Sequence, residues 1–331
     1  MHQAASTMPL LVVVGPTASG KTELAIRLAE AVDGEVINAD SVQIYRYFDI
    51  GSGKPTTEEL ARVPHHLVST LDPFEPIDAA GWANLAEACV RDTLDRGKCA
   101  IVCGGSFLWV RALLFGLAAA PKADSAVRAA HKTIAETLGR AALHQKLQEV
   151  DPILGAKLAP NDFVRVSRAL EVYELTGIPM SQWQAEHGFR EPVRPYQLLG
   201  VARERAEMDT RILARANQML TQGFVEEVIG LCERGYGEAR AMSSVGYREV
   251  KQAVELCRAA NDKKLDTLYA TERLRREGSP ERTALLGAIA QKTRVFARRQ
   301  RTWLRDEPVT WLLPDLLQDA SRLRKFALPA L

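Results

Sequence analysis

A stretch of eight residues near the start of the sequence has the residue types and the spacing that hold a phosphate group. It fits the pattern G-x-x-x-x-G-K-[ST] of nucleotide-binding and ATP-binding loops, and its residues are Gly15, Pro16, Thr17, Ala18, Ser19, Gly20, Lys21 and Thr22. The glycines let backbone N–H groups turn toward an anion, the lysine adds a positive charge, and the threonine hydroxyl is suited to Mg²⁺. The sequence therefore predicts a phosphate-binding loop with Mg²⁺ as cofactor and Thr22 as a metal ligand, but it does not identify the phosphate compound.

The segments on both sides of this loop have the patterns that such a loop requires. Residues 10–14 are apolar and mostly β-branched, which is typical of a buried parallel strand. Apolar residues then recur at helical spacing up to Gly34, namely Leu24, Ala25, Leu28, Ala29 and Val32. The alternative is a chance glycine-rich turn, which would not need a strand before it and a helix after it.

A carboxylate follows the second expected strand. Residues 35–40 indicate a short strand that ends at Asp40. In open α/β sheets, ligands bind beyond the carboxyl ends of the strands, where the phosphate loop also lies. Asp40 could therefore face the ligand of that loop, or it could only cap the next helix, and its spacing does not decide between the two.

The strand expected at residues 100–103 ends differently from the corresponding strand of a nucleotide hydrolase. A hydrolase usually has an aspartate there that holds Mg²⁺, whereas this chain continues with Gly104, Gly105 and Ser106. Glycines allow a close approach of the backbone, and Ser106 leaves a small hydroxyl in the expected cleft. Ser106 could also cap the helix expected at residues 107–114, and the two roles are compatible.

A basic segment lies at residues 292–305, which contain six basic residues and no acidic one. Four of its arginines are spaced so that they share one face of a helix, namely Arg294, Arg298, Arg301 and Arg305. Three apolar residues lie seven apart and predict a stripe on roughly the opposite side, namely Ile289, Phe296 and Trp303. We expect the helix to pack through Phe296 and Trp303 and to offer its arginines to a polyanion or a diphosphate, although a solvated charged face would have the same pattern.

The order of the expected elements predicts an α/β fold of the P-loop NTPase type, in which helices flank a parallel sheet. Helical patterns at 126–138, 141–150 and 163–176 follow one another without a strand, which indicates an all-helical insertion. Strand character returns at 197–201, and one long amphipathic helix is expected at 211–234. The expected division is 1–118 for the first part of the core, 119–194 for the insertion and 195–331 for the second part.

Composition excludes several classes of protein. The chain has 331 residues and a net charge of +2, so a basic surface must come from uneven distribution. Its five cysteines form no C-x-x-C pair, which fits neither a disulfide framework nor a zinc module and favours a reducing compartment. No apolar run approaches about 20 residues, and residues 1–9 lack a signal pattern. We therefore expect a cytoplasmic enzyme that does not span a membrane, with a monomer as the default state.

Eight segments of the sequence resemble motifs of the bacterial tRNA dimethylallyltransferases, also called tRNA isopentenyltransferases. They occur in the order of that family over nearly the whole chain: GPTASGKT at 15–22, NADSVQIY at 38–45, DIGSGKP at 49–55, PHHLVSTLDP at 64–73, VCGGSFLW at 102–109, RVSRALEVYELTG at 165–177, SSVGYRE at 243–249 and RRQRTWLR at 298–305. A phosphate loop alone says little about function, but this ordered set is very specific.

The resemblance implies a reaction. Enzymes of this family move a dimethylallyl group from dimethylallyl diphosphate to N6 of the adenine just 3′ of the anticodon in tRNA. The phosphate loop would then hold a diphosphate leaving group, and no nucleotide would be hydrolysed. The resemblance also assigns catalytic roles to Asp40, as the carboxylate hydrogen-bonded to N6–H, and to Ser106 and Lys21.

The resemblance further implies the residues that contact tRNA through its anticodon stem-loop. These are Asp40, Ser41, Val42, Gln43, Ser106, Arg128, Val164, Arg165, Val166, Ser167, Arg168, Ser244, Val245, Gly246, Tyr247, Arg248, Glu249, Arg298, Arg299, Arg301 and Arg305.

Ser106 departs from the family, since most members have threonine there. Serine keeps the hydroxyl but lacks the methyl group that restricts the rotamer, so we expect activity to survive with a looser site.

Three other functions are compatible with parts of the sequence. A P-loop kinase of a small metabolite would share the phosphate loop, but the absent strand-end aspartate and the basic helix argue against it. An adenylate isopentenyltransferase, as in cytokinin synthesis, would use a free adenosine phosphate as acceptor, whereas the helical insertion suits RNA better. A non-enzymatic RNA-binding module would leave the phosphate loop beside Asp40 unexplained.

Overall fold

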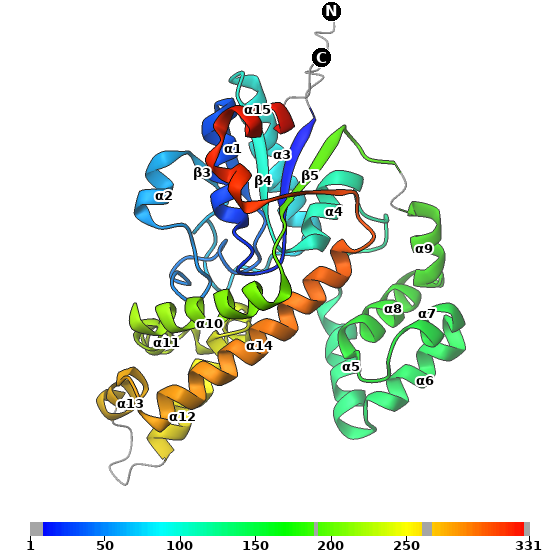
Figure 1. The fold of residues 1–331 in the computed structure, drawn as a ribbon. Helices are drawn as coiled ribbons and strands as arrows, with labels where there is room; N and C mark the ends of the chain where they lie inside the picture. Colours follow the sequence, from blue (N-terminus) through cyan, green and yellow to red (C-terminus); the bar gives the residue numbers. More distant parts are fainter. Residues whose placement is uncertain (1–8, 189–190, 260–266, 328–331) are drawn as a thin grey trace, which may run out of the picture. The chain divides into compact units, whose positions relative to one another are not determined.

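The structure is a computed structural model that describes residues 9–188, 191–259 and 267–327. The chain divides into two compact units, one formed by residues 1–114 and 194–331 and the other by residues 115–193 (Figure 1). Within the described residues, no helix combines the length and the apolar composition that crossing a bilayer requires.

The first unit contains a parallel sheet with the strand order β3-β2-β4-β1-β5-β6 in the part of the chain that is described. Its strands are β1 (Leu10–Val14), β2 (Gly34–Asn38), β3 (His65–His66), β4 (Cys99–Gly104), β5 (Tyr196–Val201) and β6 (Val309–Leu312). All five residues of β1 are buried, as are those of β2 and all six of β4. This burial explains why the sequences of β1 and β4 are nearly continuous apolar runs, whereas β2 also buries the polar residues Glu35 and Asn38.

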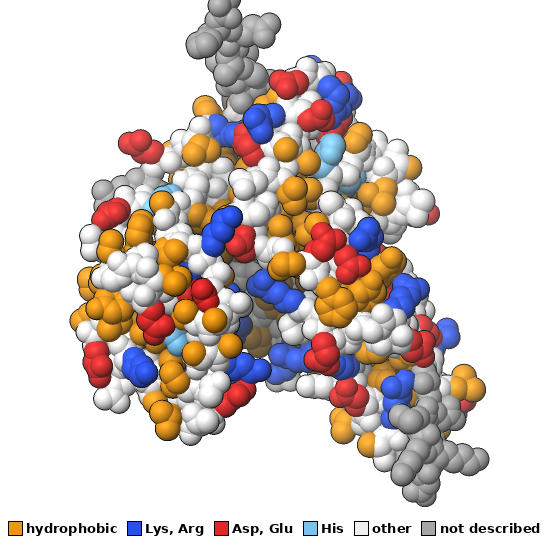
Figure 2. All heavy atoms as spheres, turned by 180° about the vertical axis from the view of Figure 1, so that it is seen from behind, with side chains coloured by type: hydrophobic (Ala, Val, Ile, Leu, Met, Phe, Trp, Pro, Cys, Tyr) orange, Lys and Arg blue, Asp and Glu red, His pale blue; other side chains and the backbone are white. Residues whose placement is uncertain are grey.

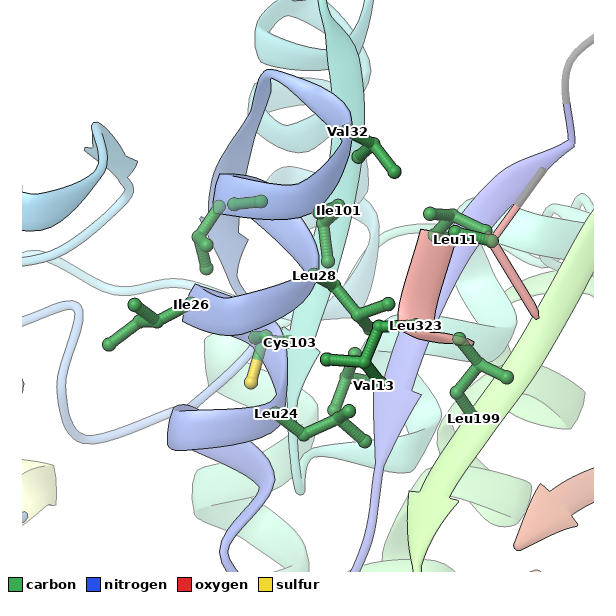
Figure 3. Close-up of a cluster of buried hydrophobic side chains, with 14 of the residues drawn as sticks. Leu11, Val13, Leu24, Ile26, Leu28, Val32, Ile101, Cys103, Leu199 and Leu323 are labelled. Carbon is green, nitrogen blue, oxygen red and sulfur yellow. The ribbon is translucent and has the colours of Figure 1, made fainter. Parts of the chain in front are cut away.

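Helices cover both faces of the central strands. Those from the first half of the chain are α1 (Lys21–Val32), α2 (Thr57–Arg62), α3 (Ala79–Asp95) and α4 (Phe107–Phe115). Helix α1 contacts β1 and β4, and α15 (Ala320–Ala327) packs against α1. Figure 3 shows the resulting core, in which Leu24 and Leu28 of α1 meet Val13 of β1, Ile101 of β4 and Leu323 of α15. This core holds the start of α1, and with it the phosphate loop, at the carboxyl edge of the sheet.

The loops after β2 and β4 lie against each other. The N–H of Ala39 donates to the carbonyl of Cys103 at 2.8 Å, and the N–H of Ser106 donates to the carbonyl of Ala39 at 3.1 Å. A Cβ atom at Gly104 would lie 2.1 Å from the oxygen of Ala39, so only glycine fits there. The two loops that carry Asp40 and Ser106 are thereby fixed to one another.

The remaining helices of the first unit are α10 (Arg205–Thr221), α11 (Phe224–Glu233), α12 (Tyr247–Ala259), α13 (Thr267–Arg275) and α14 (Pro280–Leu304). Short 3-10 helices lie at η1 (Tyr236–Glu238), η2 (Arg240–Ser243) and η3 (Pro314–Gln318). The single helix expected at 211–234 is wrong. Gly223 is left-handed, with φ of 103°, and it separates α10 from α11.

The expected packing of α14 is also wrong. Phe296 and Trp303 are 42% and 44% exposed. Of the expected stripe, Ile289 is buried, and the helix buries with it Leu285, Ala290, Ala297, Gln300 and Leu304. A hydrophobicity pattern gives little weight to an alanine and none to a glutamine, so it selected the large aromatic residues instead.

The second unit is all-helical in the described residues, with α5 (Ser125–Thr137), α6 (Arg140–Val150), α7 (Pro152–Lys157), α8 (Phe163–Thr176) and α9 (Met180–His187). Leu143, Leu147 and Leu170 belong to its buried core. The unit begins at residue 115 and ends at residue 193, where the sequence suggested 119 and 194. Its contact with tRNA stays a prediction.

Candidate active site

A cavity of about 380 Å³ lies at the carboxyl edge of the sheet. The phosphate loop contributes Thr17, Lys21 and Thr22 to its wall, and the loops after β2 and β4 contribute Asp40 and Ser106. Further parts of the wall come from α10, from residues 243–248 and from α14. The structure thus brings together around one space the three residues expected to be catalytic and the residue expected to bind Mg²⁺.

Two arginines, Arg203 just before α10 and Arg211 within it, donate hydrogen bonds to backbone carbonyls of the phosphate loop. Ala18 is left-handed, with φ of 65°, and its carbonyl accepts from Nε of Arg211 at 2.8 Å. The carbonyl of Ser19 accepts from Nε of Arg203 at 3.2 Å. Gly20 precedes α1 in the left-handed region, and no side chain caps the helix. The first N–H groups of α1 are therefore available to an anion.

Two cationic side chains that line the cavity, those of Lys21 and Arg215, are partly removed from solvent. Burial lowers the pKa of Lys21, while the charge of Asp40 opposes this shift. Burial also lowers the pKa of Arg215, and Asp40 again opposes the shift. Asp40 thus favours the charged forms of both Lys21 and Arg215, and a bound anion would favour them further.

Asp40 is held by its own loop. Its Oδ1 atom accepts from the N–H of Val42 at 2.9 Å and from the N–H of Gln43 at 3.3 Å. Residues 41–43 form turns and not a helix, so Asp40 does not cap a helix. Among the described residues, no donor is hydrogen-bonded to Oδ2, which leaves a fixed carboxylate with one oxygen available to a ligand.

Ser106 binds to the same loop. Its Oγ atom accepts from the N–H of Ser41 at 3.0 Å. The hydroxyl proton of Ser106 can therefore be donated elsewhere, because the hydroxyl has one donor and two acceptor positions. The serine fixes the residue that follows Asp40, in addition to standing at the start of α4.

A half-buried carboxylate holds the loop at residues 49–51, of which Gly51 lines the cavity. Glu227 accepts from the N–H groups of Asp49, Ile50 and Gly51 at 3.1, 2.6 and 3.1 Å. It also accepts from the hydroxyl of Tyr247 at 2.7 Å. Burial, followed by the charge of Glu227, raises the pKa of Tyr247 well above its ordinary value. Tyr247 is thus a neutral, buried phenol that organises this loop.

The residues of the first unit that were expected to contact tRNA do not all lie at the cavity. The cavity wall includes Asp40, Ser41, Val42, Gln43, Ser106, Ser244, Val245, Gly246, Tyr247, Arg248 and Arg299. Arg298, Arg301 and Arg305 are exposed, the first two on α14 and the third just after it. Glu249 is buried, accepts from the N–H of Gly246 at 2.7 Å and forms an ion pair with Arg248.

In the second unit, Glu171 holds two arginines. Its carboxylate is fully buried and accepts from Nε of Arg128 at 2.8 Å and from Nη1 of Arg168 at 2.5 Å. Val164 is 76% exposed, and Arg165 forms an ion pair with Asp162. Val166 and Ser167 are buried, and Ser167 hydrogen-bonds to His131. The side chains of these last two residues therefore face the core of the unit.

Sequence reasoning missed several residues of the site. It did not select Gln300, which hydrogen-bonds to the phosphate loop, or the arginines Arg203, Arg211 and Arg215. It also missed an apolar part of the wall formed by Ile212, Ala216, Met219 and Phe224. The i, i+4 spacing of Arg211 and Arg215 was a usable signal, because it places both on one face of α10. A single glutamine among arginines gave no such signal.

Comparison with known proteins supports one family. The IPP transferase family model matches residues 43–307. The chain is 56% identical to a tRNA dimethylallyltransferase of Sorangium cellulosum over 92% of this chain and 90% of that protein. It is 42% identical to one of Geobacter sulfurreducens over 94% of each.

Solved structures agree with these relatives. The full-length tRNA isopentenylpyrophosphate transferase of Bacillus halodurans has a TM-score of 0.63 and 30% identity, and 96% of this chain and 95% of that chain are covered. A eukaryotic dimethylallyltransferase acting on tRNA has a TM-score of 0.74 at 23% identity, with 97% and 78% covered, which is a likeness of fold. The chain therefore belongs to the IPP transferase family, the family of the tRNA dimethylallyltransferases.

Proposed function

We propose that this protein transfers the dimethylallyl group of dimethylallyl diphosphate to N6 of the adenine 3′ of the anticodon in tRNA. The observation that carries this proposal is the shared cavity of the phosphate loop, Asp40 and Ser106. In this proposal the leaving diphosphate would lie beside a carboxylate with one available oxygen. The names of the relatives support tRNA as the acceptor.

The diphosphate would bind at the start of α1. The N–H groups of the loop, Lys21 and Arg215 supply the positive end of the site, and their desolvation strengthens their interaction with an anion. Thr22 lines the same cavity and would be the protein ligand of Mg²⁺. When bound, Mg²⁺ would neutralise charge on the leaving diphosphate.

The dimethylallyl group would lie along the apolar wall, to which α10 and the start of α11 contribute. Ile212, Ala216 and Met219 follow one another at helical spacing, and Phe224 continues this surface. Apolar side chains bind a five-carbon chain by burying its surface and exclude water from the reacting carbon.

The reaction would break the bond between C1 of the allyl group and the diphosphate oxygen, which keeps the electron pair. The N6 atom of adenine would form the new bond to C1 and lose one proton. Oδ2 of Asp40 would accept that proton, since Oδ1 is already held by two N–H groups. Positioning and charge stabilisation would supply most of the catalysis.

The acceptor adenine must leave its stack to reach such a cavity, because N6 is not accessible to a reagent within the stacked loop. The exposed arginines Arg298 and Arg301 of α14 would contact RNA phosphates, as would Arg128 and Arg168 of the second unit. On the face drawn in Figure 2, basic side chains lie among acidic and hydrophobic ones. RNA binding would therefore depend on particular arginines more than on overall charge.

The five cysteines are free thiols, which suits a reducing compartment. We infer a cytoplasmic enzyme, with a monomer as the default state.

The test is transfer of label from radiolabelled dimethylallyl diphosphate in the presence of Mg²⁺. Three acceptors are compared: an unmodified tRNA with adenine 3′ of the anticodon, the same tRNA with guanine there, and AMP. We expect label in the first acceptor alone. Label in AMP would establish an adenylate isopentenyltransferase instead, and phosphate release from ATP without any transfer would indicate a kinase-like enzyme.

A further inference from the structure

A glutamine of α14 joins two loops of the candidate site. Gln300 is buried, with 5% of its surface exposed. Its Oε1 atom accepts from the N–H of Thr17 in the phosphate loop at 2.8 Å. Its Nε2 atom donates to the carbonyl of Gly105 in the turn after β4 at 3.2 Å. One amide side chain thus connects the phosphate loop to the turn that carries Ser106.

These two bonds fix the orientation of the amide and the choice of residue. The partner at one end is a donor and the partner at the other end is an acceptor, so only a side chain with both functions satisfies them. Aspartate and glutamate in their ionised forms lack the donor. Gly105 is adapted to this contact, since a Cβ atom there would lie 2.4 Å from Nε2 of Gln300.

The connection continues from the turn to the carboxylate. Gly105 precedes Ser106, whose Oγ accepts from the N–H of Ser41 at 3.0 Å. Ser41 follows Asp40 in the chain, and Oδ1 of Asp40 is held by its own loop. A continuous path therefore runs from Thr17 through Gln300, Gly105 and Ser106 to the loop of Asp40. No part of this path depends on a ligand.

We propose that Gln300 is a positioning residue that sets the separation between the phosphate loop and the Asp40–Ser106 side of the cavity. This inference rests on the proposed function, in which the diphosphate lies on the first side and the adenine amine on the second. Each substrate can bind to its own side without Gln300. Transfer requires the reacting carbon and N6 to meet at a set distance, and Gln300 fixes that distance.

The proposal predicts a separation of kcat from KM. Gln300→Ala should lower kcat of transfer roughly 10- to 100-fold, because small displacements of reacting groups have effects of that size. KM for dimethylallyl diphosphate and for tRNA should each change less than about threefold. Measurements use active-site titration, so that a reduced folded fraction does not imitate a reduced kcat.

Gln291→Ala is the matched control. Gln291 is exposed on the same helix and should tolerate the change with kcat within about twofold of the wild type. If Gln300→Ala behaves like this control, or if its kcat is unchanged while only KM rises, the positioning role is wrong.

A double-mutant cycle supplies a second test that does not depend on one variant. Gly105→Ala should displace the Gln300 amide and lower kcat to a similar extent, because its Cβ points at Nε2. In Gln300→Ala/Gly105→Ala the clash is gone, so the loss should match that of a single variant within about threefold. Losses that multiply would show that the two residues act separately and would contradict the proposal.

The two proposals fail in different ways. A wild-type enzyme that transfers no dimethylallyl group to tRNA contradicts the proposed function. A wild-type enzyme that transfers the group, together with a Gln300→Ala variant of unchanged kcat, contradicts only the role of Gln300.

Discussion

At the scale of single residues, the proposed chemistry depends on one oxygen of Asp40. Within the described residues, both hydrogen bonds of this carboxylate go to Oδ1, so the loop fixes its direction without occupying Oδ2. Asparagine would keep a similar shape and the bonds to Oδ1, but its NH2 group cannot accept a proton. The substitution therefore separates catalysis from binding.

We predict that Asp40→Asn lowers kcat of transfer by roughly 10²- to 10⁴-fold, the range of a lost general base. The Kd for tRNA should change by less than about threefold. Single-turnover transfer and direct tRNA binding measure the two quantities. Asp33→Asn, a change at an exposed position after α1, serves as control and should leave both unaltered. Equal losses of transfer and binding would contradict the role of Asp40 as base.

A second residue, Glu35 of β2, links stability to pH. Its buried carboxylate accepts from Nη2 of Arg96 at 2.7 Å and contacts Nε2 of His66 at 2.7 Å. The hydrogen bond to Arg96 is the main cause that lowers the pKa of Glu35 from 4.5 to about 2, although burial opposes it. The folded pKa is lower than the unfolded one, so this stabilisation is present above pH 4.5 and is lost as the pH falls toward 2.

Glu35→Gln should accordingly destabilise the protein by about 2 kcal/mol at pH 7, a value reduced here because Arg96 is partly exposed. The difference from the wild type should shrink as the pH falls below 4.5. Urea unfolding at several pH values between 3 and 7 measures it. A difference that is independent of pH would contradict this account of Glu35.

At the scale of elements, the sequence predicted those whose pattern is local. The strand Leu10–Val14 and the helix Phe163–Thr176 were expected within their observed bounds, because a buried run and a 3.6-residue period need no knowledge of neighbours. The helix Pro152–Lys157 was missed, since the expected helical patterns ended at residue 150 and resumed at residue 163. Pro152 is the first residue of the helix, and the Asp151 side chain caps it by accepting from the N–H of Leu154.

The close contact of the loops after β2 and β4 is an element-scale feature that can be tested. Gly104→Ala would place Cβ 2.1 Å from the backbone oxygen of Ala39, which cannot move independently of β2. We predict a loss of about 2 kcal/mol or more in the free energy of unfolding and a loss of transfer. Thermal and urea unfolding would measure the stability.

The matched control for this glycine is Gly287→Ala. Gly287 is exposed within α14, and a Cβ atom there would meet nothing within 4 Å. Alanine should stabilise the protein by about 0.5–1 kcal/mol, because it restricts the unfolded chain and favours the helix. Equal stability changes in the two variants would mean that the contact at Ala39 has no special importance.

At the scale of the whole molecule, the site joins segments that are far apart in the sequence. Thr17 and Gln300 are separated by 283 positions and are hydrogen-bonded to each other. The motifs indicated the phosphate loop, Asp40 and Ser106 because each carries a recognisable residue pattern. The spacing of Arg211 and Arg215 could have indicated Arg215. The role of Gln300 could not be indicated, since neither helical periodicity nor hydrophobicity says which polar residue will face a distant loop.

Salt dependence tests how the whole molecule would bind RNA. If exposed arginines of α14 contact phosphates, each lost contact reduces the slope of log K against log salt by about one. We predict this reduction for Arg298→Ala. Arg91→Ala, at an exposed arginine of α3, is the control and should leave the slope unchanged. An unchanged slope in Arg298→Ala would remove this arginine from the RNA surface.

The central claim is that the cavity beside the phosphate loop is where tRNA receives its dimethylallyl group. The most direct measurement is mass spectrometry of nucleosides from tRNA that has been treated with dimethylallyl diphosphate and either the wild type or Asp40→Asn. We predict N6-dimethylallyl-adenosine, at the position 3′ of the anticodon, with the wild type and almost none with the variant, although the variant still binds tRNA. The same product at the same rate from both proteins, or a group attached at another position, would contradict the claim.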